Sequence, residues 1–219
     1  MIYLDNAAST APAPEVLEAM VVAARALYAN PSSAHGMGAA AARAVEGARL
    51  AVAHALGAES PGQIVFTSGG TEADALGLAG AAGAARGRHL VVTALEHPAV
   101  LRTAEQLADN GYELTVVPAT RAGIVLVEDV VAAVRPDTAV VAVMLVNNEL
   151  GTLLPVAEIA RALKPPGASG PIAPRGPHLH VDAVQAFGFL PIRVGPLGDR
   201  KSTRLNSSHE LKSRMPSSA

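Results

Sequence analysis

The stretch Ile64–Asp74 holds the residues whose order most clearly suggests chemistry: a short apolar run, two glycines, then hydroxyl and carboxylate residues. This order predicts a strand, a turn and a helix start, where backbone N–H groups and the positive end of the helix dipole meet. Gly70 lets the backbone approach an anion closely, and Thr71 adds a hydroxyl donor. The stretch therefore suits a phosphate, although an ordinary capped turn would explain the same residues.

Three other predicted strands also end in polar side chains. These are His97 after strand 89–93, Asn148 after the apolar run 138–146, and Asp182 with Gln185 at the end of strand 178–182. Each one alone is more simply interpreted as a helix cap, a strand-end residue or a core histidine. Several such groups on one edge are harder to explain in this way, because burying unpaired polar groups costs free energy. An anion cradle, an imidazole, amides and a carboxylate are what a phosphorylated pyridine would require, since the carboxylate can keep the ring nitrogen protonated.

The elements that must position these residues alternate regularly along the chain. Strands are predicted at 63–68, 89–93, 113–117, 138–146 and 178–182, and helices at 71–85, 98–109, 127–134 and 155–163. This alternation predicts an α/β fold with three layers, α/β/α, around a mostly parallel sheet. In such sheets ligands bind beyond the carboxyl ends of the strands, which is where the polar residues fall.

Two further helices are predicted before this region, at Glu15–Tyr28 and Ala39–Leu56, separated by the breaking sequence Asn30–Ser33. The second is preceded by Gly36–Ala41, which matches the G-x-G-x-x-A form of a dinucleotide-binding fingerprint. A true fingerprint directly follows a strand and has an acidic residue at a second strand end about 20 residues later. Neither is present, so a nicotinamide-dependent oxidoreductase is the weaker hypothesis.

The composition and the charge of the chain change toward the C-terminus. Lys164–Pro177 is rich in proline and glycine and predicts a surface loop, and 187–198 predicts a short edge segment at Phe189–Ile192. Residues 1–198 carry 12 basic and 17 acidic residues, whereas 199–219 carry five basic and two acidic residues. We therefore expect 199–219 to be an unstructured, non-native tail, with a natural disordered basic tail as the alternative.

Composition excludes several classes of function. Aromatic residues make up only 3% of the chain and the net charge is −2, which argues against a nucleic-acid partner. The absence of cysteine excludes disulfides and thiolate metal sites, so no metal is expected. No signal peptide or apolar run of the roughly 20 residues needed to span a bilayer is present, and a cytoplasmic protein without a membrane partner is expected.

The same residues carry a family resemblance. Four segments resemble, in order, the motifs of the cysteine desulfurases, members of the class V aminotransferase family of pyridoxal-phosphate enzymes: Phe66–Glu72, Glu96-His97, Asn147–Gly151 and His180–Gln185. Tyr3–Ala8 and Asn30–Ser33 are similar to the N-terminal motifs of that family. The resemblance runs from about residue 2 to about residue 195, so residues 1–198 would form an incomplete pyridoxal-phosphate-binding large domain.

The resemblance implies a role for each candidate residue. The Gly70 backbone and Thr71 would bind the phosphate of pyridoxal 5'-phosphate, and His97 would stack on the ring and assist proton transfer. Asp182 would pair with the pyridine nitrogen, while Asn148 and Gln185 would contact the region of the ring hydroxyl. The implied reaction converts L-cysteine to L-alanine and passes sulfur to an acceptor protein, for iron–sulfur cluster assembly or RNA thiolation. A homodimer is implied for the full-length protein.

Two departures from the family pattern limit these implications. The family binds its cofactor covalently through a lysine in a Ser-x-His-Lys motif shortly after the region matching Leu190–Pro196, and no such motif is present. The lysines are Lys164, Lys201 and Lys212, and there is no cysteine to carry sulfur. We therefore expect a truncated desulfurase that is inactive alone; the alternatives are a selenocysteine lyase or a non-catalytic protein of the same fold.

Overall fold

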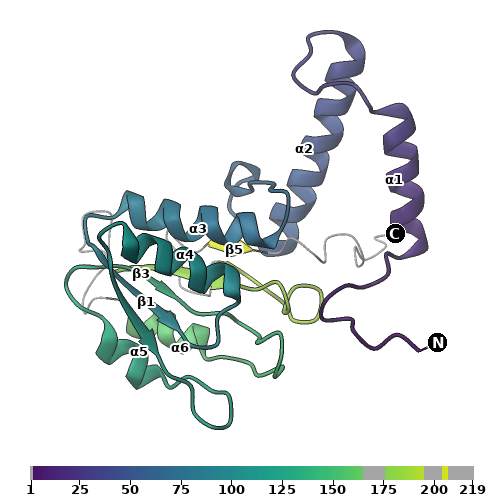
Figure 1. Cartoon of the computed structure of the whole chain (residues 1–219). Coiled ribbons are helices and arrows are strands. Elements are labelled where there is room, and N and C mark those ends of the chain that lie inside the picture. The colour runs from purple at the N-terminus through teal and green to yellow at the C-terminus, as the bar shows by residue number, and fades with distance from the viewer. Residues whose placement is uncertain (1, 165–175, 195–203, 207–219) are drawn as a thin grey trace.

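The computed structural model describes residues 2–164, 176–194 and 204–206, and its centre is a five-stranded sheet (Figure 1). The strands are β1 (His89–Thr93), β2 (Glu113–Val117), β3 (Thr138–Ala142), β4 (His178–Asp182) and β5 (Arg204–Asn206), in the spatial order β2-β1-β3-β4-β5. The helices are α1 (Pro14–Ala26), α2 (Gly36–Leu56), α3 (Gly70–Ala84), α4 (Pro98–Asp109), α5 (Val127–Ala133) and α6 (Val156–Ala162), with a short 3-10 helix at Pro61–Gln63.

All neighbouring strands pair in parallel. Helices α4, α5 and α6 are the crossovers that connect β1 to β2, β2 to β3 and β3 to β4. Parallel pairing brings the carboxyl ends of the strands to one edge of the sheet, where ligands bind in open α/β folds.

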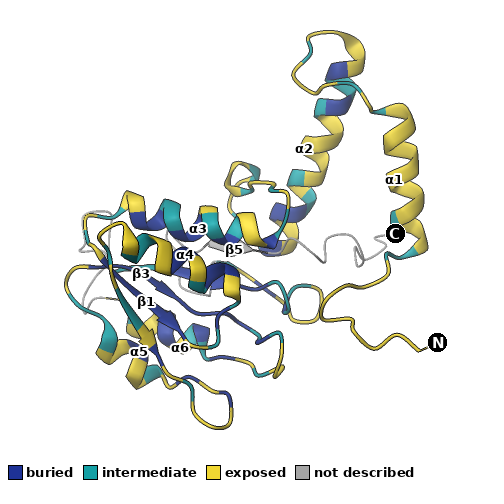
Figure 2. Ribbon diagram, in the orientation of Figure 1, coloured by how far each residue is buried: buried dark blue, intermediate teal, exposed yellow. Residues whose placement is uncertain are grey.

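Each face of the sheet is covered by two helices (Figure 1). Leu90 and Val92 of β1 belong to the apolar core that the sheet forms with α3 and α4. Val91, which points to the opposite face because strand side chains alternate, belongs to the core formed with α5 and α6. Figure 2 shows the buried strands enclosed between these two helical layers. The predicted three-layer α/β/α architecture is confirmed.

The prediction of a strand at 63–68 is wrong. The 3-10 helix ends at Gln63, and the residues between Gln63 and the start of α3 at Gly70 form no strand. Val65 and Phe66 are 67% and 44% exposed. Apolar β-type residues form a strand only beside a partner, and within the described residues this segment has none. It is held instead by Arg49 of α2, whose guanidinium donates to the Ile64 carbonyl and lies 4.9 Å from the centroid of the Phe66 ring.

The predicted strand 138–146 is shorter than expected, because β3 ends at Ala142. The chain nevertheless continues beside β4. The N–H groups of Val143 and Leu145 donate to the carbonyls of His180 and Asp182 at 3.0 and 2.8 Å. This continuation carries the chain to Asn147 and Asn148 at the carboxyl edge.

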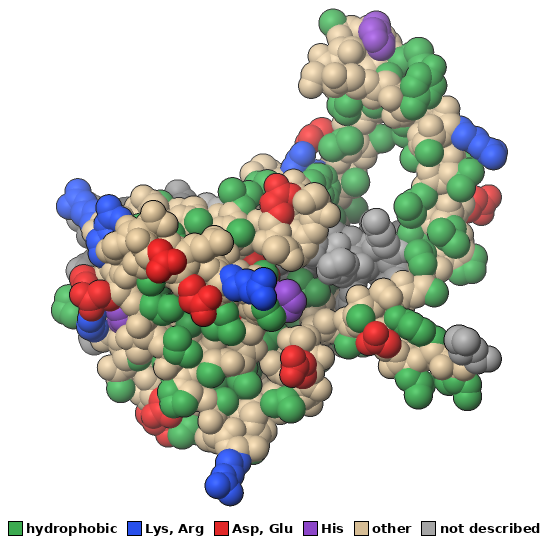
Figure 3. Space-filling model, in the orientation of Figure 1, with side chains coloured by type: hydrophobic (Ala, Val, Ile, Leu, Met, Phe, Trp, Pro, Cys, Tyr) green, Lys and Arg blue, Asp and Glu red, His purple; other side chains and the backbone are tan. Residues whose placement is uncertain are grey.

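Helices α1 and α2 project away from the sheet (Figure 1). No residue of α1 is buried, and Figure 3 shows hydrophobic side chains exposed along it. Helix α2 begins at Gly36 directly after a loop, so no strand precedes the G-x-G-x-x-A sequence. A Cβ at Gly38 would clash with the Ser33 carbonyl oxygen. Gly38 is thus explained by close packing of the helix on the Asn30–Ser33 loop, without a dinucleotide.

The C-terminal predictions are tested only in part. Phe189–Ile192 does not form an edge strand. A turn joins Phe187 to Leu190, which form one isolated bridge, and Pro191 and Ile192 have no regular secondary structure. Most of the predicted Lys164–Pro177 loop lies outside the described residues, as does most of 199–219; within the latter, Arg204–Asn206 forms β5. In the described ranges, no helix combines the length and apolarity needed to cross a bilayer.

Candidate active site

The candidate residues lie at or after the carboxyl ends of β1, β3 and β4 and at the start of α3. Helix α3 begins at Gly70, which is buried, and its first turn exposes Thr71. Its N-cap, Gly69, provides no side-chain hydrogen bond. No N-cap side chain therefore lies over the start of α3, where the positive end of the helix dipole favours an anion.

Glu72 is the acidic residue of this first turn. Its Oε2 accepts hydrogen bonds from both the N–H and the hydroxyl of Ser68, each at 2.6 Å. These two bonds lower the pKa of Glu72. Because the Ser68 N–H is already used in this way, a phosphate would have to be bound by the first turn of α3 itself.

His97 is the N-cap of α4 and lies directly after the turn that follows β1. Its Nδ1 accepts a hydrogen bond from the Ala99 N–H at 3.1 Å. An acceptor at Nδ1 requires the neutral ring to carry its proton on Nε2. The helix start thus fixes both the tautomer and the orientation of the half-buried imidazole.

Asp182 is the last residue of β4 and is 5% exposed. Its Oδ1 accepts the Val184 N–H at 2.9 Å, and no described residue donates to its Oδ2. Burial and the neighbouring Asp74 raise the pKa of Asp182 to about 6, against the opposing influence of the Val184 N–H, His180 and His97. Asp182 is therefore a buried carboxylate with one oxygen available to a ligand.

Asp74 and His180 were not among the predicted site residues, although Asp74 ends the stretch Ile64–Asp74 and His180 begins a motif that carries the resemblance. His180 precedes Asp182 by two residues on β4, so both side chains point to the face that α3 covers. His180 Nε2 lies 3.3 Å from Asp74 Oδ1, and both side chains are at least 98% buried. A single sequence does not identify such buried polar residues as partners, because it does not show which residues face each other across the core.

Glu96 is a third buried residue at this edge that was not among the predicted site residues. It is 5% exposed, and burial raises its pKa to about 7 despite hydrogen bonds from Thr93 and Met144. His180 and Asp182 also act on it electrostatically, with opposite signs. The carboxyl edge thus contains three buried carboxyl groups and two imidazoles within electrostatic range.

The two predicted amides are placed differently. The Gln185 side chain donates to the Ala7 carbonyl at 3.0 Å and so ties the N-terminal segment to the end of β4. Asn148 is half-buried, and its side chain makes no hydrogen bond with any described residue. The structure therefore brings His97 and Asp74 of α3 within electrostatic range of Asp182, but no hydrogen bond in the described part links Asn148 or Gln185 to them.

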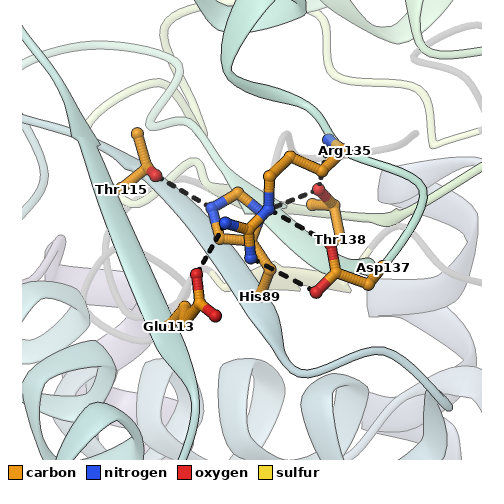
Figure 4. A network of polar contacts seen from close by, with 6 residues as sticks. All are labelled: His89, Glu113, Thr115, Arg135, Asp137 and Thr138. Atoms are coloured by element: carbon orange, nitrogen blue, oxygen red, sulfur yellow. Dashed lines mark hydrogen bonds and ion pairs between the residues drawn. The ribbon is translucent and has the colours of Figure 1, made fainter.

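A second polar network lies at the opposite edge, where the strands begin (Figure 4). Buried His89, the first residue of β1, contacts Thr138 through Nδ1 and Thr115 through Nε2, both at 2.8 Å. Arg135 pairs nearby with Glu113 and Asp137 at 2.6 and 3.1 Å. Because ligands bind at the carboxyl edge, this network is structural.

The residues at the carboxyl edge fit a phosphorylated pyridine. The start of α3, whose N-cap Gly69 has no side chain, suits a dianionic phosphate, and the Asp182 oxygen without a donor among the described residues suits a protonated ring nitrogen. The half-buried imidazole of His97 supplies a flat surface for the ring.

Comparisons with known proteins identify relatives of this chain. Residues 2–198 match the family model described as aminotransferase class-V. A cysteine desulfurase IscS of Dictyoglomus turgidum (strain DSM 6724 / Z-1310) is 38% identical over 199 residues, which are 90% of this chain and 48% of that protein. A solved structure of a NifS-like protein superposes with a TM-score of 0.80 at 38% identity, covering 90% of this chain and 52% of that one. A structure described as SspA in complex with cysteine gives a TM-score of 0.81 at 34% identity, with 90% and 55% covered.

The chain therefore spans about half the length of the relatives that it matches. The family model matches most of the chain, and solved structures of similar sequence share its fold. The chain belongs to the class-V aminotransferase family.

Proposed function

We propose that this chain is part of a pyridoxal-phosphate-dependent cysteine desulfurase, in which Asp182 holds the pyridine nitrogen and the start of α3 holds the phosphate. The observation that carries the proposal is the buried Asp182 carboxylate, with one oxygen bound to the Val184 N–H and the other without a donor among the described residues. The names of relatives, such as the cysteine desulfurase IscS of Dictyoglomus turgidum, support the choice of reaction.

The side chains at this edge would share the work of binding and proton transfer. Gly70 and Thr71 would bind the phosphate, and Asn148 and Gln185 would contact the ring hydroxyl. When bound, the cofactor would supply an electron-withdrawing ring that stabilises negative charge developing on the amino-acid substrate. His97 would hold or move the proton at Nε2, because its Nδ1 is used by the Ala99 N–H.

We expect this chain alone to bind the cofactor weakly and not to turn over. None of Lys164, Lys201 and Lys212 stands in a motif that matches the cofactor-bearing lysine of the family. Lys164 follows α6, the crossover that returns the chain to the amino end of β4 and thus away from Asp182. A homodimer, a cytoplasmic location and a sulfur-acceptor protein for iron–sulfur assembly or RNA thiolation are part of the same proposal, and the resemblance supports them.

Equilibrium dialysis with pyridoxal phosphate tests the binding part of the proposal. The chain should retain the cofactor, Asp182→Asn and Thr71→Ala should each weaken its affinity by about tenfold or more, and the exposed Asp109→Asn should not change it. Equal affinities for wild type and Asp182→Asn would refute the assigned site.

Incubation with the cofactor and L-cysteine tests the activity. Alanine or sulfide release above the rate with free cofactor would show that the chain does turn over, contrary to the proposal. L-selenocysteine in a parallel incubation distinguishes the selenocysteine lyase alternative.

A further inference from the structure

Two loops meet at the carboxyl edge, and each carries one candidate site residue. The turn 94–97 follows β1 and ends at His97, while the segment 143–151 follows β3 and contains Asn148. The two loops are joined by two hydrogen bonds, both donated by the 143–151 segment. The Met144 N–H donates to the Glu96 side chain, and the Asn147 side chain donates to the Leu95 carbonyl.

Glu96 makes the first of these contacts. Its Oε1 accepts the Met144 N–H at 2.7 Å and also the hydroxyl of Thr93, the last residue of β1, at 2.6 Å. Its Oε2 is buried and has no partner in the described part of the structure. One oxygen of Glu96 therefore joins the end of β1 to the continuation of β3, while the other contributes no bond.

Asn147 makes the second contact. Its Nδ2 donates to the Leu95 carbonyl at 3.0 Å, and its Oδ1 accepts the N–H groups of Glu149 and Leu150 at 3.0 and 2.8 Å. The side chain is thus used at both ends, once to shape the turn that contains Asn148 and once to hold the turn that precedes His97. Asn147 is 6% exposed, and a buried amide with good partners is costly to disrupt.

We propose that Glu96 and Asn147 are positioning residues, which together form a brace between the loops that carry His97 and Asn148. With both bonds in place, the imidazole and the amide keep a fixed separation and move only together. The roles of His97 and Asn148 toward the cofactor rest on the proposed function, whereas the brace itself does not.

The charge state of Glu96 fits this role. The titratable groups that act on it are His180 and Asp182 of β4, and Asp182 in turn interacts with Asp74 of α3 and with His97. Asp182 is acidic, so a carboxylic acid at Glu96 avoids placing a buried negative charge beside it and still accepts both bonds through Oε1. Burial accordingly raises the pKa of Glu96 to about 7.

Amide hydrogen exchange in the chain without cofactor tests the brace directly. Glu96→Ala should speed exchange of the Met144 N–H by about tenfold or more, which corresponds to about 1.4 kcal/mol. Glu96→Gln should retain its protection, since the amide oxygen can accept both bonds. Asn147→Asp should speed exchange of the Glu96 N–H, because the side-chain donor to the Leu95 carbonyl is lost. The N–H groups of Glu149 and Leu150 should remain protected from exchange.

Val100→Ala is the matched control, because it opens the buried core of the adjacent helix without touching the brace. Equal acceleration of the Met144 N–H in Val100→Ala and Glu96→Ala would overturn the proposal, as would loss of protection in Glu96→Gln. If Glu96→Ala fails to fold, Glu96→Gln and Asn147→Asp still decide the matter by the same measurement.

Cofactor affinity provides a second, separable measurement. Glu96→Ala and Asn147→Asp should weaken pyridoxal-phosphate binding by about tenfold, with Val100→Ala unchanged. Absence of binding by the wild-type chain would count against the proposed function, but the exchange data would still confirm or refute the brace.

Discussion

The imidazole of His180 on β4 faces the carboxylate of Asp74 on α3, with His180 Nε2 3.3 Å from Asp74 Oδ1 and both side chains buried. This contact joins the start of the helix that would bind a phosphate to the strand that ends in Asp182. The Nδ1 atom of the same imidazole has no partner among the described residues. The Asp74 contact is therefore the hydrogen bond that satisfies this ring.

Removing that contact should destabilise the chain. Asp74→Ala leaves both nitrogens of a buried imidazole without a partner, so the free energy of unfolding should fall by about 1–3 kcal/mol in urea denaturation. Asp74→Asn should cost less, because an amide oxygen can still accept from His180. Asp109→Asn, an exposed position on α4, is the control. Wild-type stability of Asp74→Ala would show that the pair contributes nothing.

Cofactor affinity should depend on pH through Asp182. Because its pKa is raised to about 6, the carboxylate that pairs with a protonated ring nitrogen is lost as the pH falls through that value. Affinity for pyridoxal phosphate should then fall by up to about tenfold per pH unit below about pH 6. Equilibrium dialysis at a series of pH values from about 8 to about 5 measures this affinity. Asp182→Asn is the control, because its pH profile reports the effect of ionisation of the cofactor itself. Parallel pH profiles for the two proteins would contradict the prediction.

Chain stability should depend on pH through Glu96. Its pKa is about 7 in the folded chain and near 4.5 when unfolded, so the folded state binds the proton more tightly. The stabilisation is complete below the unfolded value and is lost as the pH rises through about 7, a loss of about 3 kcal/mol. Urea denaturation across this range should show a steeper decline for wild type than for Glu96→Gln. Identical slopes would exclude a raised pKa at Glu96.

His89 should titrate below its ordinary value. Burial lowers its pKa, and the positive charge of Arg135 lowers it further, while Asp137 and Glu113 oppose this (Figure 4). Proton NMR titration of the ring should therefore give a pKa below 6.5, and Arg135→Gln should raise it. Asp137→Asn should move it in the opposite direction. A His89 pKa that does not respond to either substitution would refute the electrostatic account of this network.

Most of the architecture was predictable because the strands of a parallel sheet are buried on both faces. Continuous apolar runs such as 138–146, alternating with helical patterns, therefore specified the layers. The segment 63–68 shows the limit of this reasoning. Its residues have the composition of a strand, but a strand also needs a neighbour, and composition does not say whether one is present.

The candidate site was predictable to the extent that it depends on where strands end. His97 and Asp182 could be placed at one edge by topology alone. The contacts of Asp74, Glu96 and Asn147 could not, because each depends on a partner from a different element. The hydrogen bond from Gln185 to Ala7 could not be predicted either, because it joins residues 178 positions apart; the role of Gln185 toward a ligand stays a prediction.

The lack of any buried residue in α1 has a thermodynamic consequence. The heat-capacity change of unfolding arises mainly from apolar surface that becomes exposed to water. Because α1 already exposes its surface, its melting should contribute little to that change, and thirteen residues are close to the lower limit for an isolated helix. Calorimetry should therefore record the cooperative unfolding of the sheet and its covering helices, while circular dichroism should detect additional helix loss at lower temperature.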